Sequence, residues 1–151
     1  MDFTIRKALA GDAEKISQCV KNAYAPYIER IGKPPGPMLD DYAEVIEKHI
    51  VFTIDTDNDL AAVLVLIEND GGILLDNVAV DPAYQGQRVG SCLLSLAESA
   101  AKKRGYSAID LYTHEKMTEN IPLYEKRGYV ETERKNVNGY ERIYMRKSLT
   151  A

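Results

Sequence analysis

The chain contains 151 residues, a length typical of one domain of about 100–200 residues. Hydrophobic residues make up 45% and charged residues 28%. A chain of this kind buries a full core, so it is neither a disordered segment nor a disulfide-stapled miniprotein. Nineteen Lys and Arg stand against 23 Asp and Glu, a net charge of -4, which argues against general electrostatic binding to nucleic acid or to an anionic membrane.

The sequence also indicates a compartment. Met1 to Arg6 runs into polar sequence without the apolar region of a signal peptide, and the longest apolar run, Leu60 to Ile67, is far too short to cross a bilayer. Cys19 and Cys92 lie in different helical patterns with no Cys or His partner nearby, which favours reduced thiols over a zinc site, with Cys92 facing the core. We therefore expect a cytoplasmic protein with no bound metal.

Hydrophobic periodicity divides the chain into alternating strands and helices. Short runs of branched apolar residues bounded by turn residues predict strands over Phe3–Lys7, Ile50–Asp55, Leu60–Glu68, Ile73–Val80, Ser107–Thr113, Tyr129–Lys135 and Tyr140–Lys147. Apolar positions three or four residues apart predict helices that open at Gly11-Asp12, at Asp40 or Asp41, at Arg88 and at Asn120, and end near Gly32, Lys48, Arg104 and Arg127.

Turn residues connect these elements. Three prolines and two glycines between Gly32 and Pro37 predict an irregular loop, and Asn138-Gly139 predicts a hairpin between the last two strands. The element order places an antiparallel meander before a β-α-β crossover. We therefore predict an α+β (mixed α/β) fold in a single domain spanning residues 1–151.

The most informative segment runs from Val78 to Ser91 and predicts a strand, a tight loop and the start of a helix. A glycine-bearing loop before a helix directs several backbone N–H groups at one point, where the helix dipole favours an anion such as a diphosphate. An ordinary strand-to-helix connection is the alternative. A Walker A loop is excluded because no Lys separates Gly90 from Ser91, and the three glycines of a Rossmann fingerprint are missing.

This segment resembles motif A of the GNAT superfamily of acetyl-CoA-dependent N-acetyltransferases, Q/R-x-x-G-x-G/A after a strand that ends in a V-x-P turn. Gln85, Gly90 and Val80-Asp81-Pro82 match, whereas Arg88 replaces the first glycine of the pattern. Arg88 either adds a cation beside the pyrophosphate or projects to solvent. The resemblance implies that acetyl-CoA is bound by Val78, Ala79, Val80, Gln85, Gly86, Gln87, Arg88, Val89, Gly90 and Ser91.

Residues 120–129 resemble motif B of the same superfamily, N-x-x-A-x-x-L-Y-E-K-x-G-F. Asn120 and Tyr124 are four residues apart and therefore share one helical face. The resemblance implies that the Tyr124 hydroxyl lies beside the thioester sulfur and protonates the departing thiolate, while Asn120 touches the pantetheine arm. Alternatively, Tyr124 is a core or rim aromatic residue and Asn120 caps the helix.

The resemblance covers nearly the whole chain and implies a mostly antiparallel twisted sheet flanked by about four helices, with a V-shaped splay between the fourth and fifth strands. Backbone groups of Val78 and Val80 would hold pantetheine there and polarise the thioester carbonyl. Strand alternation would put Asp76 on their face, as the proton acceptor for the amine. A bulge would break that phase and favour Asn77, and a solvated carboxylate is the other interpretation of Asp76.

The acceptor side is implied by the resemblance alone. In the family, the first two helices and their loop wall the acceptor site, which makes Tyr24, Tyr27, Arg30, Met38, Tyr42 and, after the fifth strand, His114 the candidate substrate-binding residues. Tyrosines at helical spacing also suit packing, and Arg30 also suits a surface salt bridge.

These features together predict a function. We expect direct transfer of acetyl from acetyl-CoA to a primary amine of a small molecule or peptide in a ternary complex. Family habit is compatible with a homodimer through the C-terminal strands. A non-catalytic acyl-CoA-binding or regulatory module is the alternative function.

Overall fold

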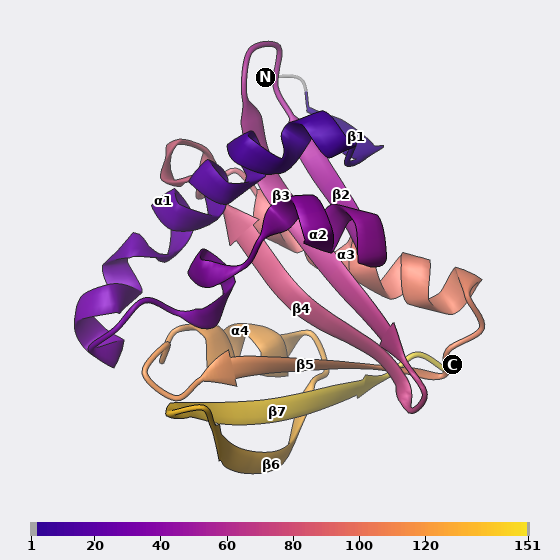
Figure 1. The fold of residues 1–151 in the computed structure, drawn as a ribbon. Helices are drawn as coiled ribbons and strands as arrows, with labels where there is room; N and C mark the ends of the chain where they lie inside the picture. Colours follow the sequence, from indigo (N-terminus) through magenta and orange to yellow (C-terminus); the bar gives the residue numbers. More distant parts are fainter. Residues whose placement is uncertain (1–2, 151) are drawn as a thin grey trace.

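The computed structural model describes residues 3–150, so the ends of the predicted domain, residues 1–2 and 151, lie outside the described residues. It contains a seven-stranded sheet in the order β1-β2-β3-β4-β5-β7-β6 (Figure 1). The strands span Thr4–Lys7 (β1), Ile50–Asp55 (β2), Leu60–Asn69 (β3), Gly72–Val80 (β4), Ala108–His114 (β5), Val130–Val137 (β6) and Tyr140–Ser148 (β7). Only β4 and β5 pair in parallel, which confirms the predicted mixed, mostly antiparallel sheet.

Helices cover both faces of this sheet. They are α1 (Ala13–Ile31), α2 (Tyr42–Lys48), α3 (Val89–Lys103) and α4 (Asn120–Lys126). Helices α1 and α2 lie on one face, and α3 and α4 lie on the other (Figure 1). Within residues 3–150, no helix is long and apolar enough to span a membrane.

The loop between α1 and α2 differs from the sequence expectation. Gly32 ends α1 in the left-handed conformation, with φ of 90°, as predicted for a helix stop. Residues 32–35 form no regular structure, as predicted, but Gly36 and Pro37 begin a short 3-10 helix that spans Gly36–Leu39. Pro37 stands in its first turn, where a proline ring presets a helical φ and the missing N–H costs nothing. The side chain of Asp41 then accepts hydrogen bonds from two backbone N–H groups and caps α2.

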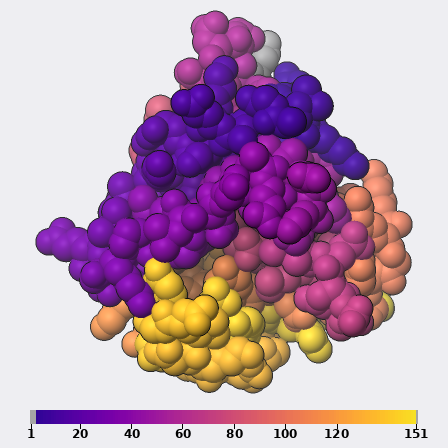
Figure 2. All heavy atoms as spheres, in the orientation of Figure 1, coloured from indigo at the N-terminus to yellow at the C-terminus, as the bar shows by residue number. Residues whose placement is uncertain are grey.

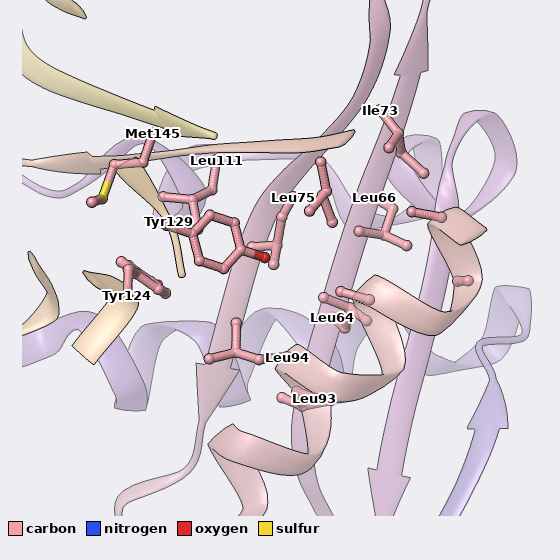
Figure 3. Packing of buried hydrophobic residues seen from close by; sticks show 14 of the residues in the cluster. Leu64, Leu66, Ile73, Leu75, Leu93, Leu94, Leu111, Tyr124, Tyr129 and Met145 are labelled. Carbon is pink, nitrogen blue, oxygen red and sulfur yellow. The ribbon is translucent and has the colours of Figure 1, made fainter. Parts of the chain in front are cut away.

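Two hydrophobic clusters sandwich the sheet. The larger packs β3, β4, β5 and β7 against α3 and α4, and Figure 3 shows Leu64 and Leu66 of β3 on the side of the sheet that α3 covers, with Leu93 and Leu94 of α3 in the same cluster. The smaller packs α1 and α2 on the other face. The expectation that Cys92 faces the core is wrong, because the buried stripe of α3 begins at Val89 and leaves Cys92 exposed.

The strands β4 and β5 separate along their length. They pair only at Leu74 with Asp110 and at Leu75 with Leu111, although β4 continues to Val80. The β3 register skips one residue of β4 at this point, which identifies a β-bulge at Asp76. Beyond the bulge the edge of β4 has no partner strand, and this is the V-shaped splay that was predicted.

Candidate active site

A groove of about 470 Å³ extends from the V between β4 and β5 to the start of α3. It is lined by α1, by the β4–α3 segment and by α4, through Ala23, Tyr24, Tyr27, Val78, Val80, Tyr84, Gln85, Gly86, Arg88, Val89, Gly90, Asn120, Leu123 and Tyr124. Three predicted cofactor-binding residues do not line it. The side chain of Ala79 packs under α1 and α2 instead, while Gln87 and Ser91 are exposed at the surface.

Beyond the bulge, the edge of β4 presents to this groove backbone groups that no described strand pairs with. The Val80 carbonyl accepts a hydrogen bond from the Gln85 side chain at 3.2 Å, and the Val78 carbonyl lies 3.2 Å from the Tyr24 hydroxyl. Both carbonyls therefore point away from β3. Since the N–H and C=O of one residue point to the same side of an antiparallel ladder, the N–H groups of Val78 and Val80 also face the V. Donors in this position are suited to a developing oxyanion.

The loop before α3 supplies an anion-binding helix terminus. Gly86 and Arg88 both adopt left-handed conformations, with φ of 82° and 64°. No side chain caps the helix, and its first intrahelical bond runs from the Cys92 N–H to the Arg88 carbonyl. The preceding N–H groups of the first turn are thus free for a ligand, where the helix dipole attracts negative charge.

Tyr124 stands where this groove meets a second cavity. It is 9% exposed, and its ring packs edge-on against Tyr129 with the centroids 5.9 Å apart (Figure 3). Within residues 3–150 its hydroxyl makes no hydrogen bond. Burial raises the pKa of Tyr124 to about 12, so the hydroxyl keeps its proton at neutral pH. The side-chain amide of Asn120, on the same helix face, donates to Thr113 Oγ1 at 3.3 Å.

The second cavity, of about 60 Å³, lies on the α1 side of the sheet. It shares Tyr24, Val78, Asn120 and Tyr124 with the groove, so the two spaces meet at these residues. Its other walls come from the α1–α2 connection, β4, β5, the turn after β5 and β7, namely Ile31, Pro35, Gly36, Pro37, Leu75, Asp76, Tyr112, Thr113, His114, Met117, Tyr140 and Arg142.

The bulge decides where Asp76 points. The expectation that Asp76 shares the face of Val78 and Val80 is wrong, because the extra residue puts both Asp76 and Asn77 on the side of α1 and α2. Asp76 lines the second cavity, where its Oδ1 accepts a hydrogen bond from the Tyr112 hydroxyl at 3.0 Å. Burial raises the pKa of this carboxyl, which makes it a stronger base than an exposed aspartate.

Asn77 is held by two tyrosines. Its amide nitrogen donates to the Tyr42 hydroxyl at 3.0 Å, and its Oδ1 lies 2.9 Å from the Tyr24 hydroxyl. Tyr42 is buried, and its hydroxyl donates in turn to the Pro37 carbonyl. Tyr42 therefore lines neither cavity and supports the second cavity from behind, whereas Tyr24 lines both spaces.

The remaining predicted substrate-binding residues have separate positions. Tyr27 lines the groove rather than the second cavity, and Arg30 forms an exposed ion pair with Glu119 at 2.7 Å. Met38 lines neither space and packs in the cluster beneath α1 and α2. His114 lines the second cavity, with its ring edge-on to Tyr140. Burial lowers the pKa of His114, which favours the neutral imidazole.

Sequence reasoning did not name several residues of the second cavity, of which Tyr112, Tyr140 and Arg142 matter most for its chemistry. Tyr112 alternates along β5 with the buried Leu111 and Thr113, so its position in the predicted strand was a usable signal for the opposite face. Tyr140 and Arg142 of β7 had no such signal, because only the pairing of β7 with β5 brings Arg142 opposite His114.

Comparison with known proteins gives one family. The family model described as "Acetyltransferase (GNAT) family" matches residues 17–129, a range that contains both the β4–α3 segment and α4. No curated protein matches the chain.

Solved structures share the fold at low sequence identity. The ribosomal-protein-S18-alanine N-acetyltransferase from Escherichia coli has a TM-score of 0.80 at 22% identity, covering 99% of this chain and 96% of that one. The PaiA N-acetyltransferase from Thermoplasma acidophilum, solved in complex with coenzyme A, has a TM-score of 0.79 at 20% identity and coverages of 98% and 99%. A GNAT family acetyltransferase from Staphylococcus aureus has a TM-score of 0.81 at 14% identity and coverages of 99% and 100%.

Proposed function

The chain belongs to the acetyltransferase (GNAT) family, and we propose that it transfers acetyl from acetyl-CoA to a primary amine of a small molecule or peptide, within a single catalytic domain. One observation carries the proposal: Tyr124 lies at the junction of the groove and the second cavity, beside the unpaired edge of β4. A proton donor, an acyl site and an acceptor site thereby meet at one point.

The groove fits the acetyl donor by its own chemistry. The free N–H groups at the start of α3 suit the diphosphate, and the exposed edge of β4 suits the amide groups of the pantetheine arm. Acetyl-CoA supplies the thioester carbonyl that the amine attacks. The N–H group of Val78, at the junction beside Tyr124, stabilises the negative charge that develops on the carbonyl oxygen, and the N–H group of Val80 binds the pantetheine arm.

Two side chains handle the protons. Asp76 accepts a proton from the ammonium, directly or through a water, and leaves a neutral amine. A C–N bond forms and the C–S bond breaks, and Tyr124 donates its proton to the departing thiolate, whose ordinary pKa is about 8.5 by analogy with a free cysteine. After the C–N bond forms, the attacking nitrogen loses one further proton. That proton passes to the Tyr124 phenolate and restores its hydroxyl. The net reaction converts ammonium and thioester to amide, free thiol and one proton.

Calorimetric titration of the purified protein with acetyl-CoA is the first test, with ATP and NAD as controls. We expect saturable one-to-one binding of acetyl-CoA alone. Release of free thiol in the presence of amines then tests transfer. Binding without turnover of any amine would identify the non-catalytic acyl-CoA-binding module, and absence of acetyl-CoA binding would overturn the proposed function.

A further inference from the structure

The second cavity contains two opposite charges that attract each other across the space but make no direct contact. Asp76 accepts one hydrogen bond, from Tyr112 to Oδ1, and within residues 3–150 its Oδ2 accepts none. Arg142 lines the same cavity, and no carboxylate of the described residues comes within 4.0 Å of its guanidinium. The two groups thus share a cavity without forming an ion pair.

Arg142 is nevertheless held in a defined position. Its guanidinium carbon lies 3.9 Å from the centroid of the Tyr112 ring, and its Nη1 donates to the Tyr144 hydroxyl at 3.2 Å. Stacking on one tyrosine and bonding to another fixes the plane of the group while most of its N–H donors stay free. By contrast, Arg146 on the same face of β7 donates hydrogen bonds from two of its nitrogens to the carboxylate of Asp110.

Tyr112 links the two charges. Its hydroxyl binds Asp76 and its ring carries Arg142, so carboxylate and guanidinium lie at opposite parts of one aromatic side chain. A ligand that brings one positive and one negative group satisfies both, and a fixed guanidinium fork matches a carboxylate in particular. Asp40 and Asp76 both attract the Arg142 guanidinium through space, but a ligand with an amine alone leaves most of the half-buried N–H donors of Arg142 without an acceptor.

The outer wall favours a small ligand. The Tyr140 hydroxyl donates to the Pro34 carbonyl, and Lys33 lies 4.0 Å above the Tyr140 ring and donates to the Asn138 carbonyl. These contacts join the α1–α2 connection to the β6–β7 hairpin, and Figure 2 shows the yellow C-terminal strands touching the N-terminal segment on this face. With the wall closed on this side, the space of about 60 Å³ favours a small ligand.

From this arrangement we propose that the acceptor is a small free amino acid, whose ammonium meets Asp76 and whose carboxylate meets Arg142. The inference rests on the proposed function and names its substrate class. An amino acid placed this way directs its nitrogen toward Val78 and Tyr124, at the junction with the groove. The carboxylate lies at the far side of the cavity, beside β7.

The test compares matched acceptors. Free thiol release from acetyl-CoA is measured with the proteinogenic amino acids, with their carboxamides and with the amines that lack the carboxylate. We expect at least one amino acid to be acetylated with kcat/KM about 10- to 100-fold above that of its carboxamide, the range of a charge-assisted hydrogen bond. Arg142→Met should abolish this ratio between acid and carboxamide. Arg146→Met, on the same strand and face, should preserve it.

The outcomes separate the two proposals. If acetyl-CoA does not bind in the calorimeter, the proposed function itself fails. If acetyl-CoA binds and the carboxamides or simple amines react as well as the acids, the amino acid proposal alone is wrong. It is also wrong if acetyl-CoA binds and no amino acid reacts, or if Arg142→Met lowers turnover of acid and carboxamide by the same factor.

Discussion

The two ends of the cleft are built from different parts of the chain. The groove is formed largely by one continuous segment, Val78 to Gly90, and works through backbone N–H groups and the end of a helix. The second cavity is assembled from the α1–α2 connection, β4, β5 and β7, and its contact between Tyr140 and Pro34 joins residues 106 positions apart. The groove, which we call the donor end, therefore tolerates many side chains. The second cavity, which we call the acceptor end, depends on individual side chains.

The largest effect is expected where the two ends meet. Tyr124→Phe removes the proton donor and leaves the aromatic ring against Tyr129, so kcat should fall about 10²- to 10³-fold while the Kd of acetyl-CoA changes little. Steady-state thiol release and calorimetry measure the two quantities. Tyr106→Phe, whose hydroxyl binds the exposed Glu68 away from the cleft, is the matched control. A parallel loss of binding and turnover would show that Tyr124 is structural.

Asp76→Asn tests the acceptor end alone. We expect kcat to fall about 10- to 100-fold, because water replaces the carboxylate as proton acceptor, with the Kd of acetyl-CoA unchanged. Asp110→Asn removes the same charge nearer the start of β5, where Asp110 pairs with Arg146 outside the second cavity, and is the control. An equal loss in both variants would contradict a role for Asp76 in proton transfer.

The pH dependence of the wild-type enzyme sharpens this assignment. Burial raises the pKa of Asp76 above its ordinary 3.8, so the rate should begin to fall on acidification at a higher pH than an exposed aspartate would give. Tyr124, with a pKa of about 12, stays protonated and should cause no loss on the alkaline side until the pH approaches that value. If the wild-type enzyme and the Asp76→Asn variant have the same pH profile of kcat/KM, Asp76 is not the proton acceptor.

The same raised pKa predicts that the Asp76→Asn variant is more stable than the wild-type protein. The folded protein binds the Asp76 proton more tightly than the unfolded chain, so the free energy of unfolding decreases as the pH rises from about 3.8 through the folded pKa. At neutral pH the ionised buried carboxylate is fully destabilising, and Asp76→Asn should raise Tm. Thermal unfolding at pH 7 measures this, and a lower Tm for Asp76→Asn would show that the carboxylate is well compensated by Tyr112.

The contrast between the two ends also explains what the sequence could reveal. Gln85 to Gly90 lie beside one another in the chain, so their loop and helix start were predictable from local spacing, as were the strands around them. The direction of the Asp76 side chain was not predictable from local spacing. It depends on a one-residue bulge, which exchanges the two faces of the strand for the residues that follow. The sequence did not predict Arg142 as a site residue, because its position opposite His114 depends on the pairing of β7 with β5.

A smaller effect is expected at the outer wall of the acceptor end. Tyr140→Phe removes the hydrogen bond to the Pro34 carbonyl and loosens the link between the α1–α2 connection and β7. One such bond contributes about 0.5–1.5 kcal/mol, so the KM of the amine should rise about two- to tenfold, with the Kd of acetyl-CoA unchanged. Tyr106→Phe, which loses a hydroxyl bond to Glu68 and lines neither the groove nor the second cavity, is the control. An unchanged KM would show that the wall does not shape the acceptor cavity.

The smallest effect concerns the donor end, where the chain departs from the family pattern. Arg88 occupies a left-handed conformation with φ of 64°, which costs a residue with a Cβ about 1–2 kcal/mol. Glycine removes that cost but gains about 0.4–1 kcal/mol of entropy in the unfolded chain. Arg88→Gly should therefore stabilise the protein by about 0.5–1 kcal/mol and raise Tm by about 1–4 °C. Arg88→Ala keeps the Cβ and should give no gain.

The same two variants decide what the Arg88 charge does. Its guanidinium lines the groove and forms no ion pair within residues 3–150, so it is available to the phosphates of acetyl-CoA. One exposed ion pair with a phosphate is worth about 0.2–1 kcal/mol, so both variants should weaken acetyl-CoA binding by up to about fivefold. If Arg88→Gly instead gains stability at unchanged Kd, Arg88 projects to solvent, and the donor end binds its anion through backbone groups alone.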